Sequence, residues 1–419
     1  MTGPATYDKR THAAARTDDY VFHQLIPYLG NKRRLLGLIG QAVDATCPPP
    51  SATALDLFAG SGVVARFLKR RGLRVVANDW EPYARPINTC AVACNRAPAF
   101  RALGGYEAAI ARLNALPPRE GWITRHLCPR DDARYDTAVD RMFYMRKNGL
   151  RLDAMRQQIE DWTREGVIDG DEAACLLSPL LFQACYTSNT SGVFKGFHNG
   201  WGGQTGAALY RIASDLALSP AVFHDNGLDN RVLCLDAQAA AESLRGEDIH
   251  LAYLDPPYNQ HPYASNYHVL NTLTLWDAPE TPATITPGTK SAIRLDWRAE
   301  RRSAYNYRGE ATAAYTLLIK TIRARYVLTS YSTDGMIPLR EMIAANLERG
   351  DTQVFMQGYK RYRVSSQRFS AKPVNVEFVL VANTLKRPSR SRDEIEESIL
   401  RREKRALAVH PETRSLCAV

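Results

Sequence analysis

The sequence contains no long apolar run and no paired cysteine motif. The longest uncharged stretch, residues 173–194, still holds Gln183 and Asn189, whose polar groups lipid would leave unsatisfied, so a membrane span is excluded. Residues 1–20 lack an apolar core and carry acidic side chains, which argues against a signal peptide. None of the eight cysteines forms a C-x-x-C pair, so we expect reduced cytosolic thiols rather than disulfides or zinc ligands.

Several catalytic signatures are absent as well. There is no H-E-x-x-H motif and no cluster of His and Cys, so no metal site is expected. Without a G-x-x-x-x-G-K-[ST] loop, ATP-driven translocation has no visible motif. The absence of E-x-K argues against a fused nuclease of the PD…ExK type. The absence of a P-C dipeptide argues against a cysteine nucleophile that would form 5-methylcytosine.

The residues that are present describe a folded, basic chain. Hydrophobic residues make up 45 % of the 419, which is enough for a full-sized core and roughly two to three domain-sized units. Lys and Arg number 54 and Asp and Glu number 44, so the net charge is +10. A surplus of this size supports a polyanionic partner only weakly, and a solvated basic surface is an equally good interpretation.

Short apolar runs alternate with segments of helical periodicity in residues 21–100 and 228–385. An apolar run at 53–59, a helical stretch at 63–71 and a second run at 73–78 predict a strand–helix–strand unit with parallel strands. Further strands are expected at 231–235, 249–254 and 325–330, helices at 263–276 and 337–349, and a closing antiparallel hairpin at 352–362 and 374–381. The alternation predicts an α/β fold with a Rossmann-like, mostly parallel sheet.

The stretch between these two parts has a different pattern. Residues 101–227 are rich in Arg, Ala and Asp, with helical periodicity around 150–162 and 172–186, so we expect a mainly helical insertion. Residues 1–20 are expected to form a flexible arm. Residues 386–419 are expected to form a charged C-terminal helix and tail.

A glycine motif follows the first strand and reads Asp56-Leu57-Phe58-Ala59-Gly60-Ser61-Gly62. It lacks the third glycine of the dinucleotide fingerprint, which favours a nucleoside with a short polar tail over a pyrophosphate. Asp79 ends the second strand, where it can accept hydrogen bonds from ribose hydroxyls. The plainer interpretation is a tight turn between strand and helix, with Asp79 as a helix cap.

A second motif, Asp255-Pro256-Pro257-Tyr258, directly follows the apolar strand at 249–254. Two prolines remove two backbone donors, so the corner is rich in acceptors and suits an amino group with two protons to donate. Such bonds would draw the nitrogen lone pair out of ring conjugation, and Tyr258 offers a flat face on which a base can stack. The plainer interpretation is a stiffened turn with a solvated acid, but its place at a strand end favours function.

These motifs, taken with YLGNKRRLL from Tyr28, resemble the alpha-group DNA adenine-N6 methyltransferases in kind and in order. The resemblance implies a methyltransferase sheet, S-adenosylmethionine as methyl donor, and target recognition by the insertion at 101–227. This insertion is longer than in compact members of the family. For the cofactor, the resemblance implies contacts from Tyr28, Lys32, Asp56, Phe58, Gly60, Asp79, Asp236 and Asp255.

The resemblance implies a role for several of these residues and for two residues that follow Asp255. Lys32 and Asp56 hold the methionine end, Asp79 binds ribose, and Asp236 accepts from the adenine amine of the cofactor. Asp255, Pro256 and Tyr258 handle the target adenine. Taken without the family, the favoured interpretation of Lys32 is the start of a solvent-facing basic helix, and Asp236 could equally be a strand-end cap.

Aromatic residues alternate with arginines at 294–308, a pattern that suits contact with nucleic-acid phosphates and bases. The residues expected to contact DNA there are Arg298, Arg301, Arg302 and Tyr305, and a weaker group at a glycine-rich loop is Lys195, His198 and Trp201. The alternative for both groups is an exposed loop without a ligand.

The sequence therefore predicts site-specific methyl transfer to N6 of an adenine flipped out of double-stranded DNA. The alternatives are adenine-N6 methylation of RNA, cytosine-N4 methylation, and a DNA-binding protein that has lost catalysis. Glutamine methylation is disfavoured because that site usually reads NPPY. We expect a cytoplasmic monomer or weak dimer, encoded by a bacterium or phage, with no metal or membrane partner. A separate restriction endonuclease is a possible partner.

Overall fold

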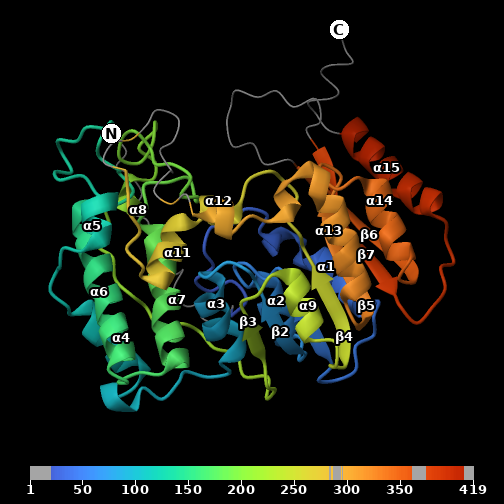
Figure 1. Cartoon of the computed structure of the whole chain (residues 1–419), viewed down its shortest axis with the longest axis horizontal. Helices are drawn as coiled ribbons and strands as arrows, with labels where there is room; N and C mark the ends of the chain where they lie inside the picture. Colours follow the sequence, from blue (N-terminus) through green and yellow to red (C-terminus); the bar gives the residue numbers. More distant parts are fainter. Residues whose placement is uncertain (1–19, 283–284, 286–293, 295, 361–373, 410–419) are drawn as a thin grey trace, which may run out of the picture.

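The computed structural model describes residues 20–282, 285, 294, 296–360 and 374–409. Most of the expected N-terminal arm and the last ten residues of the expected tail lie outside this range. The strands form a seven-stranded sheet with the order β3-β2-β1-β4-β5-β7-β6 (Figure 1). The strands are β1 (Thr53–Asp56), β2 (Arg74–Asn78), β3 (Arg231–Leu233), β4 (Ile249–Leu254), β5 (Ala324–Ser332), β6 (Asp351–Lys360) and β7 (Val374–Asn383).

The strands β3, β2, β1, β4 and β5 pair in parallel, whereas β7 runs antiparallel to both β5 and β6. This confirms the predicted Rossmann-like sheet with a closing antiparallel hairpin. The strand β4 is buried along its whole length, as expected for a parallel strand covered on both faces. Its alternate residues divide between the two faces, with Leu251 and Tyr253 on one and Ala252 and Leu254 on the other.

Helices cover both faces of the sheet. One face packs against α1 (Leu36–Asp44) and α2 (Val63–Arg70). The other packs against α9 (Ala237–Ser243), α13 (Arg308–Thr321), α14 (Leu339–Leu347) and α15 (Arg392–Val409). The predicted C-terminal helix is therefore present as α15, at the edge formed by β6 and β7 (Figure 1).

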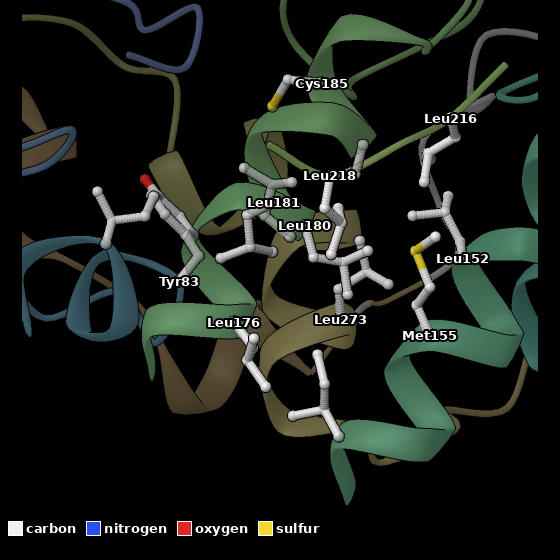
Figure 2. Close-up of a cluster of buried hydrophobic side chains, with 14 of the residues drawn as sticks. Tyr83, Leu152, Met155, Leu176, Leu180, Leu181, Cys185, Leu216, Leu218 and Leu273 are labelled. Atoms are coloured by element: carbon white, nitrogen blue, oxygen red, sulfur yellow. The ribbon is translucent and has the colours of Figure 1, made fainter. Parts of the chain in front are cut away.

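The predicted insertion is largely helical and lies on the side of the molecule opposite α15 (Figure 1). Its helices are α4 (Tyr106–Asn114), α5 (Trp122–Leu127), α6 (Arg146–Arg164), α7 (Gly170–Tyr186) and α8 (Leu209–Ile212). Figure 2 shows Leu152, Leu176 and Leu180 of the insertion in one cluster with Tyr83 and Leu273, which come from outside it. The insertion thus shares a hydrophobic core with α3 (Ala84–Asn88) and α11 (His268–Leu275), and the boundaries at 101 and 227 stay a prediction.

Two helices differ from the expected pattern. The single helix predicted at 263–276 is α10 (Tyr263–Asn266) followed by α11, because Tyr267 departs from helical geometry while its hydroxyl accepts the Leu29 backbone N–H at 2.8 Å. The helix α13 was not predicted. It has no side-chain cap, carries Gly309 in its first turn and leaves Leu317 55 % exposed, so the usual start signals and a clean apolar stripe are missing. A short helix, α12 (Trp297–Glu300), precedes it.

Candidate active site

A cavity lies at the carboxyl ends of the parallel strands, where β1 separates β2 from β4 and the strand order reverses. Open α/β sheets bind their ligands at such a switch point. The cavity measures about 720 Å³, counted with the space at its mouth. Its lining includes Tyr28, Leu57, Phe58, Asp79, Trp80, Glu81, Asp236, Asp255, Tyr263, Arg301, Tyr305 and Asn306.

The glycine turn after β1 is fixed by close approach and by hydrogen bonding. Gly60 has φ +50°, and a Cβ added to it would lie 2.7 Å from the ring of Tyr28, so only glycine fits. Its backbone N–H donates to Asp79 Oδ2 at 2.7 Å, and the N–H of Glu81 donates to Asp79 Oδ1 at 2.8 Å. Asp79 therefore holds the turn in place and also lines the cavity. Burial raises the pKa of Asp79 to about 6, although the hydrogen bonds from these backbone N–H groups lower it.

Glu81 is a second acid in the cavity wall that the sequence analysis missed. It is buried, and Asn271 Nδ2 donates to its Oε2 at 2.8 Å. Burial raises the pKa of Glu81 to about 7, while the nearby Arg301 guanidinium and the Asn271 bond oppose that rise. Its position two residues after Asp79, just beyond a strand end, is the signal that could have found it.

The apolar wall of the cavity comes from two rings that are far apart in sequence. Phe58 and Tyr305 meet edge to face, with 5.5 Å between ring centroids. Tyr305 is only 7 % exposed, and Arg301 beside it donates from Nη1 to the Trp80 carbonyl at 3.1 Å. Tyr305 and Arg301 were both predicted to contact DNA. The structure places them in the cavity wall instead, because the segment after α12 folds back over the cavity.

The other two predicted contacts of this segment have different surroundings. Arg302 forms a two-pronged ion pair with Glu310, with one bond at 2.8 Å, and its guanidinium lies 3.8 Å from the ring centroid of Tyr307. Its fork is therefore engaged at the start of α13. Arg298 is exposed on α12, so its predicted contact with DNA stays a prediction.

The Asp255-Pro256-Pro257-Tyr258 corner carries a buried ion pair. Lys32 Nζ lies 2.8 Å from Asp255 Oδ1, and Lys32 is only 5 % exposed, so the interpretation of Lys32 as a solvent-facing residue is wrong. Burial raises the pKa of Asp255 and the Lys32 ammonium lowers it, with a net rise. For Lys32, burial lowers the pKa, but the carboxylates of Asp255 and Glu377 more than reverse this. The pairing thus favours the charged form of both residues.

Asp56 lies beside this pair but is sealed from the cavity. It is 1 % exposed, and neither of its carboxyl oxygens has a hydrogen-bond partner that meets normal geometry among the described residues. Burial and the Asp255 charge raise its pKa well above the usual range, although the backbone N–H groups of Phe58 and Ala65 oppose this. Neither Asp56 nor Lys32 belongs to the cavity lining, whereas Asp255 does.

Asp236 and Tyr28 both line the cavity, as their predicted roles require. Asp236 is also the cap of α9, because its Oδ1 accepts the backbone N–H of Gln238 at 2.9 Å, so the cap interpretation is correct, and its contact with a cofactor stays a prediction. Tyr28 stacks on Tyr267 and Tyr263 at 5.1 and 5.2 Å between ring centroids.

A second, more open cavity of about 1050 Å³ adjoins the first on the far side of the corner. Pro262 and Asn306 line both cavities. The remaining lining is Tyr258, Asn259, Gln260, His261, Tyr307, Arg308, Asp334 and Met336. Asp255 faces the first cavity and Tyr258 the second, so the corner stands between two adjoining hollows.

The glycine-rich loop between α7 and α8 reaches the second cavity at one point. Lys195 is exposed, and its Nζ lies 3.4 Å from Nδ1 of His261. Trp201 is half-buried, and its indole N–H donates to the Asp132 carbonyl at 2.8 Å, so it is held within the insertion. His198 is half-buried, and its backbone N–H is bonded to a carbonyl of the same loop.

Comparison with known proteins shows the family of the chain. The model of the D12 class N6 adenine-specific DNA methyltransferases matches residues 28–293. The chain belongs to this family. Its reaction is therefore methyl transfer to N6 of adenine in DNA, as the sequence analysis predicted.

Three relatives illustrate the breadth of the family. The chain is 30 % identical to the type II methyltransferase M.NlaIII of Neisseria lactamica over 74 % of this chain and 83 % of that protein. It is 25 % identical to M.CviAII of Paramecium bursaria Chlorella virus 1 over 81 % and 93 %. It is 27 % identical to the modification methylase LlaI of Lactococcus lactis over 84 % of this chain but only 54 % of that longer protein.

Two further observations bear on partners of the methyltransferase. Within the described ranges, no group of three or more His, Cys, Asp or Glu residues is placed to hold a metal ion. No helix in the same part of the chain is long and apolar enough to cross a membrane.

Proposed function

We propose that the first cavity binds S-adenosylmethionine and that the second receives the target adenine. When bound, this donor supplies a methyl group made electrophilic by the positively charged sulfur. The fit rests on the donor set of the cavity, which offers an aromatic wall at Phe58 and Tyr305 and carboxyl groups at Asp79 and Glu81. Such a lining suits a purine face and the two hydroxyls of a ribose.

Within that cavity, each acid has a task that its surroundings support. Asp79 and Glu81 would accept hydrogen bonds from the ribose hydroxyls, and Asp236 would accept from the purine amine. The backbone around Gly60 and the ring of Tyr28 would lie near the donor's sulfur end, and Lys32 and Asp56 would lie beyond it, close to its methionine group. The orphaned carboxyl oxygens of Asp56 would be satisfied by an ammonium group, provided that the corner opens to admit it.

At the corner, Asp255 is the residue that would act on the target amine. A target adenine in the second cavity would stack against Tyr258, and its amine would donate to Asp255 and to the carbonyl of Pro256. These bonds orient the nitrogen lone pair toward the methyl group. Asp255 then stabilises the positive charge that develops on the nitrogen, which requires it to be ionised. Lys32 favours that ionised form, because the ion pair opposes the effect of burial.

The adenine must leave the duplex to reach this corner, which costs a few kcal/mol. Stacking on Tyr258 offsets about 1–3 kcal/mol of that cost. Arg298 and Lys195, both exposed, would contact the DNA, with His198 nearby in the loop. The guanidinium of Arg302 would first have to leave Glu310 to do so.

We further propose a cytoplasmic monomer or weak dimer that modifies specific sites, alongside a separate restriction endonuclease.

The observation that carries this proposal is the position of Asp255 between the two cavities, and its substitution is the test. Asp255→Ala should lower kcat by about a thousandfold or more while the Kd for S-adenosylmethionine changes by less than about fivefold, because Asp255 acts mainly in the transition state. The readouts are tritiated methyl incorporation into duplex DNA, with mass analysis of the modified nucleoside, and calorimetric titration with the donor.

Asp248→Ala is the matched control, since Asp248 is an exposed acid at the opposite end of the same strand and pairs only with Arg325 among the described residues. It should retain normal turnover. Near-normal turnover of Asp255→Ala, or N4-methylcytosine as the product, would refute the proposal.

A further inference from the structure

The C-terminal helix α15 is anchored to the sheet domain by a strip of residues at four-residue spacing. Ile395 and Ile399 are fully buried in the core on the α14 side of the sheet. Arg340 of α14 forms ion pairs with Asp393 and Glu396 at 2.9 and 2.8 Å. This helix lies about a hundred residues beyond the segment that the family model matches, so the family reaction assigns it no role.

The buried strip of α15 continues with a charged residue. Glu403 follows Ile399 by four residues and therefore lies on the same face. It is only 6 % exposed, and its Oε1 accepts the hydroxyl of Thr333 at 2.8 Å. A carboxylate at a core-facing position is costly unless its hydrogen bonds are strong, so this contact needs an explanation beyond packing.

Thr333 is the first residue after β5, and its groups are fully engaged. Its hydroxyl donates to Glu403 and accepts the Val376 N–H at 3.3 Å, while its own N–H donates to the Val376 carbonyl at 3.1 Å. The hydroxyl thus ties the end of β5 to β7 and to α15 at once. The position of the segment 333–336 therefore depends on the hydrogen bonds of Thr333.

The segment 333–336 forms one wall of the second cavity. Asp334 and Met336 line the cavity together with Tyr258. The N–H of Met336 donates to the backbone carbonyl of Tyr258 at 3.2 Å. Glu403 is therefore linked to the Tyr258 backbone by two hydrogen bonds, one at Thr333 and one at Met336, which the chain of residues 333–336 connects.

We propose that Glu403 is a positioning residue through which α15 holds the loop 333–336, and with it Tyr258, in the geometry that receives the flipped adenine. This rests on the proposed role of the second cavity. Loss of the Glu403 bond loosens the cavity wall, so the flipped base is held less well. The first cavity is lined by none of these residues and keeps its affinity for the methyl donor.

The test compares variants of both partners on a duplex whose methylated site has been mapped by sequencing DNA from an expressing host. Glu403→Ala should lower kcat about tenfold, which is the loss expected for one hydrogen bond to a charged group. The Kd for S-adenosylmethionine should stay within about twofold. Glu403→Gln retains an acceptor oxygen and should restore most of the rate. Thr333→Val should match Glu403→Ala, and Thr333→Ser should resemble the unmodified protein.

A fluorescent readout separates positioning from loss of folding. With 2-aminopurine in place of the target adenine, Glu403→Ala should show a smaller rise in fluorescence on binding, because fewer bases are held outside the duplex. Glu397→Ala removes an exposed acid of the same helix that pairs with Arg401 and serves as the control, with no change expected.

Normal turnover of Glu403→Ala would overturn the inference. So would an equal fall in turnover and donor affinity in Glu403→Ala and Glu403→Gln, which would mark a general loss of folding. Failure of the proposed function has a different signature, because then Tyr258→Ala itself would leave the 2-aminopurine signal unchanged.

Discussion

The two cavities that meet at Asp255 are built differently. The first is smaller, with an aromatic wall and the neighbouring acids Asp79 and Glu81, of which Glu81 is buried, and its glycine turn is fixed by bonds to Asp79. The second is wider, and its lining consists mostly of polar residues that lie outside the strands. A preformed pocket suits a ligand that arrives alone, whereas an open one suits a base that arrives attached to a large substrate. The difference teaches that donor binding and base capture can be disturbed separately.

The largest expected effect on donor binding concerns the first, preformed cavity. Gly60→Ala places a methyl group against the ring of Tyr28 at a positive φ, so it should weaken S-adenosylmethionine binding by about a hundredfold or more and lower the melting temperature. Calorimetric titration and thermal denaturation measure the two effects.

Gly72→Ala controls for backbone strain alone. Gly72 has φ +79° with no atom of the described residues near the added carbon, so this variant should lose about 1 kcal/mol of stability with unchanged donor affinity. Equal donor affinity in the two variants would show that the turn at Gly60 does not shape the pocket.

A smaller effect, on the pH dependence of activity, is expected from the ion pair between Lys32 and Asp255 at the boundary between the cavities. Burial raises the pKa of Asp255 and Lys32 opposes the rise, so Lys32→Met should raise that pKa further. Activity needs the ionised acid. It is therefore lost as the pH falls through the Asp255 pKa, and in the variant the loss begins at a higher pH.

Profiles of kcat against pH at saturating donor measure this shift. Arg33→Met removes an exposed cation from the adjacent position and should leave the profile in place. An unchanged acid limb in Lys32→Met would mean that Asp255 does not control the rate.

The parts of the site that the sequence could predict are those set by local pattern. The turn at Gly60 and the corner at Asp255 follow short apolar strands, and parallel strands bring their carboxyl ends together whatever the rest of the chain does. Asp79 and Asp236 follow strands in the same way. Asp79, Asp236 and Asp255 line one cavity together with Leu57 and Phe58 of the glycine motif, whereas Gly60 itself is not part of the lining.

The missed features depend on contacts between distant segments. The alternation of arginine and aromatic residues at 294–308 looks alike whether the segment faces DNA or the protein, and only packing against Phe58 turns Tyr305 inward. The burial of Lys32 similarly requires Asp255, more than two hundred residues away, as its partner. No local periodicity carries that information.

The division of labour between the two cavities is tested most directly by measuring the Kd for S-adenosylmethionine, without DNA, in Tyr305→Ala and Tyr258→Ala. Both substitutions remove one tyrosine ring, one from each cavity. We expect Tyr305→Ala to weaken donor binding about tenfold and Tyr258→Ala to change it by less than about twofold. A loss of donor affinity in Tyr258→Ala, with none in Tyr305→Ala, would contradict this division of labour.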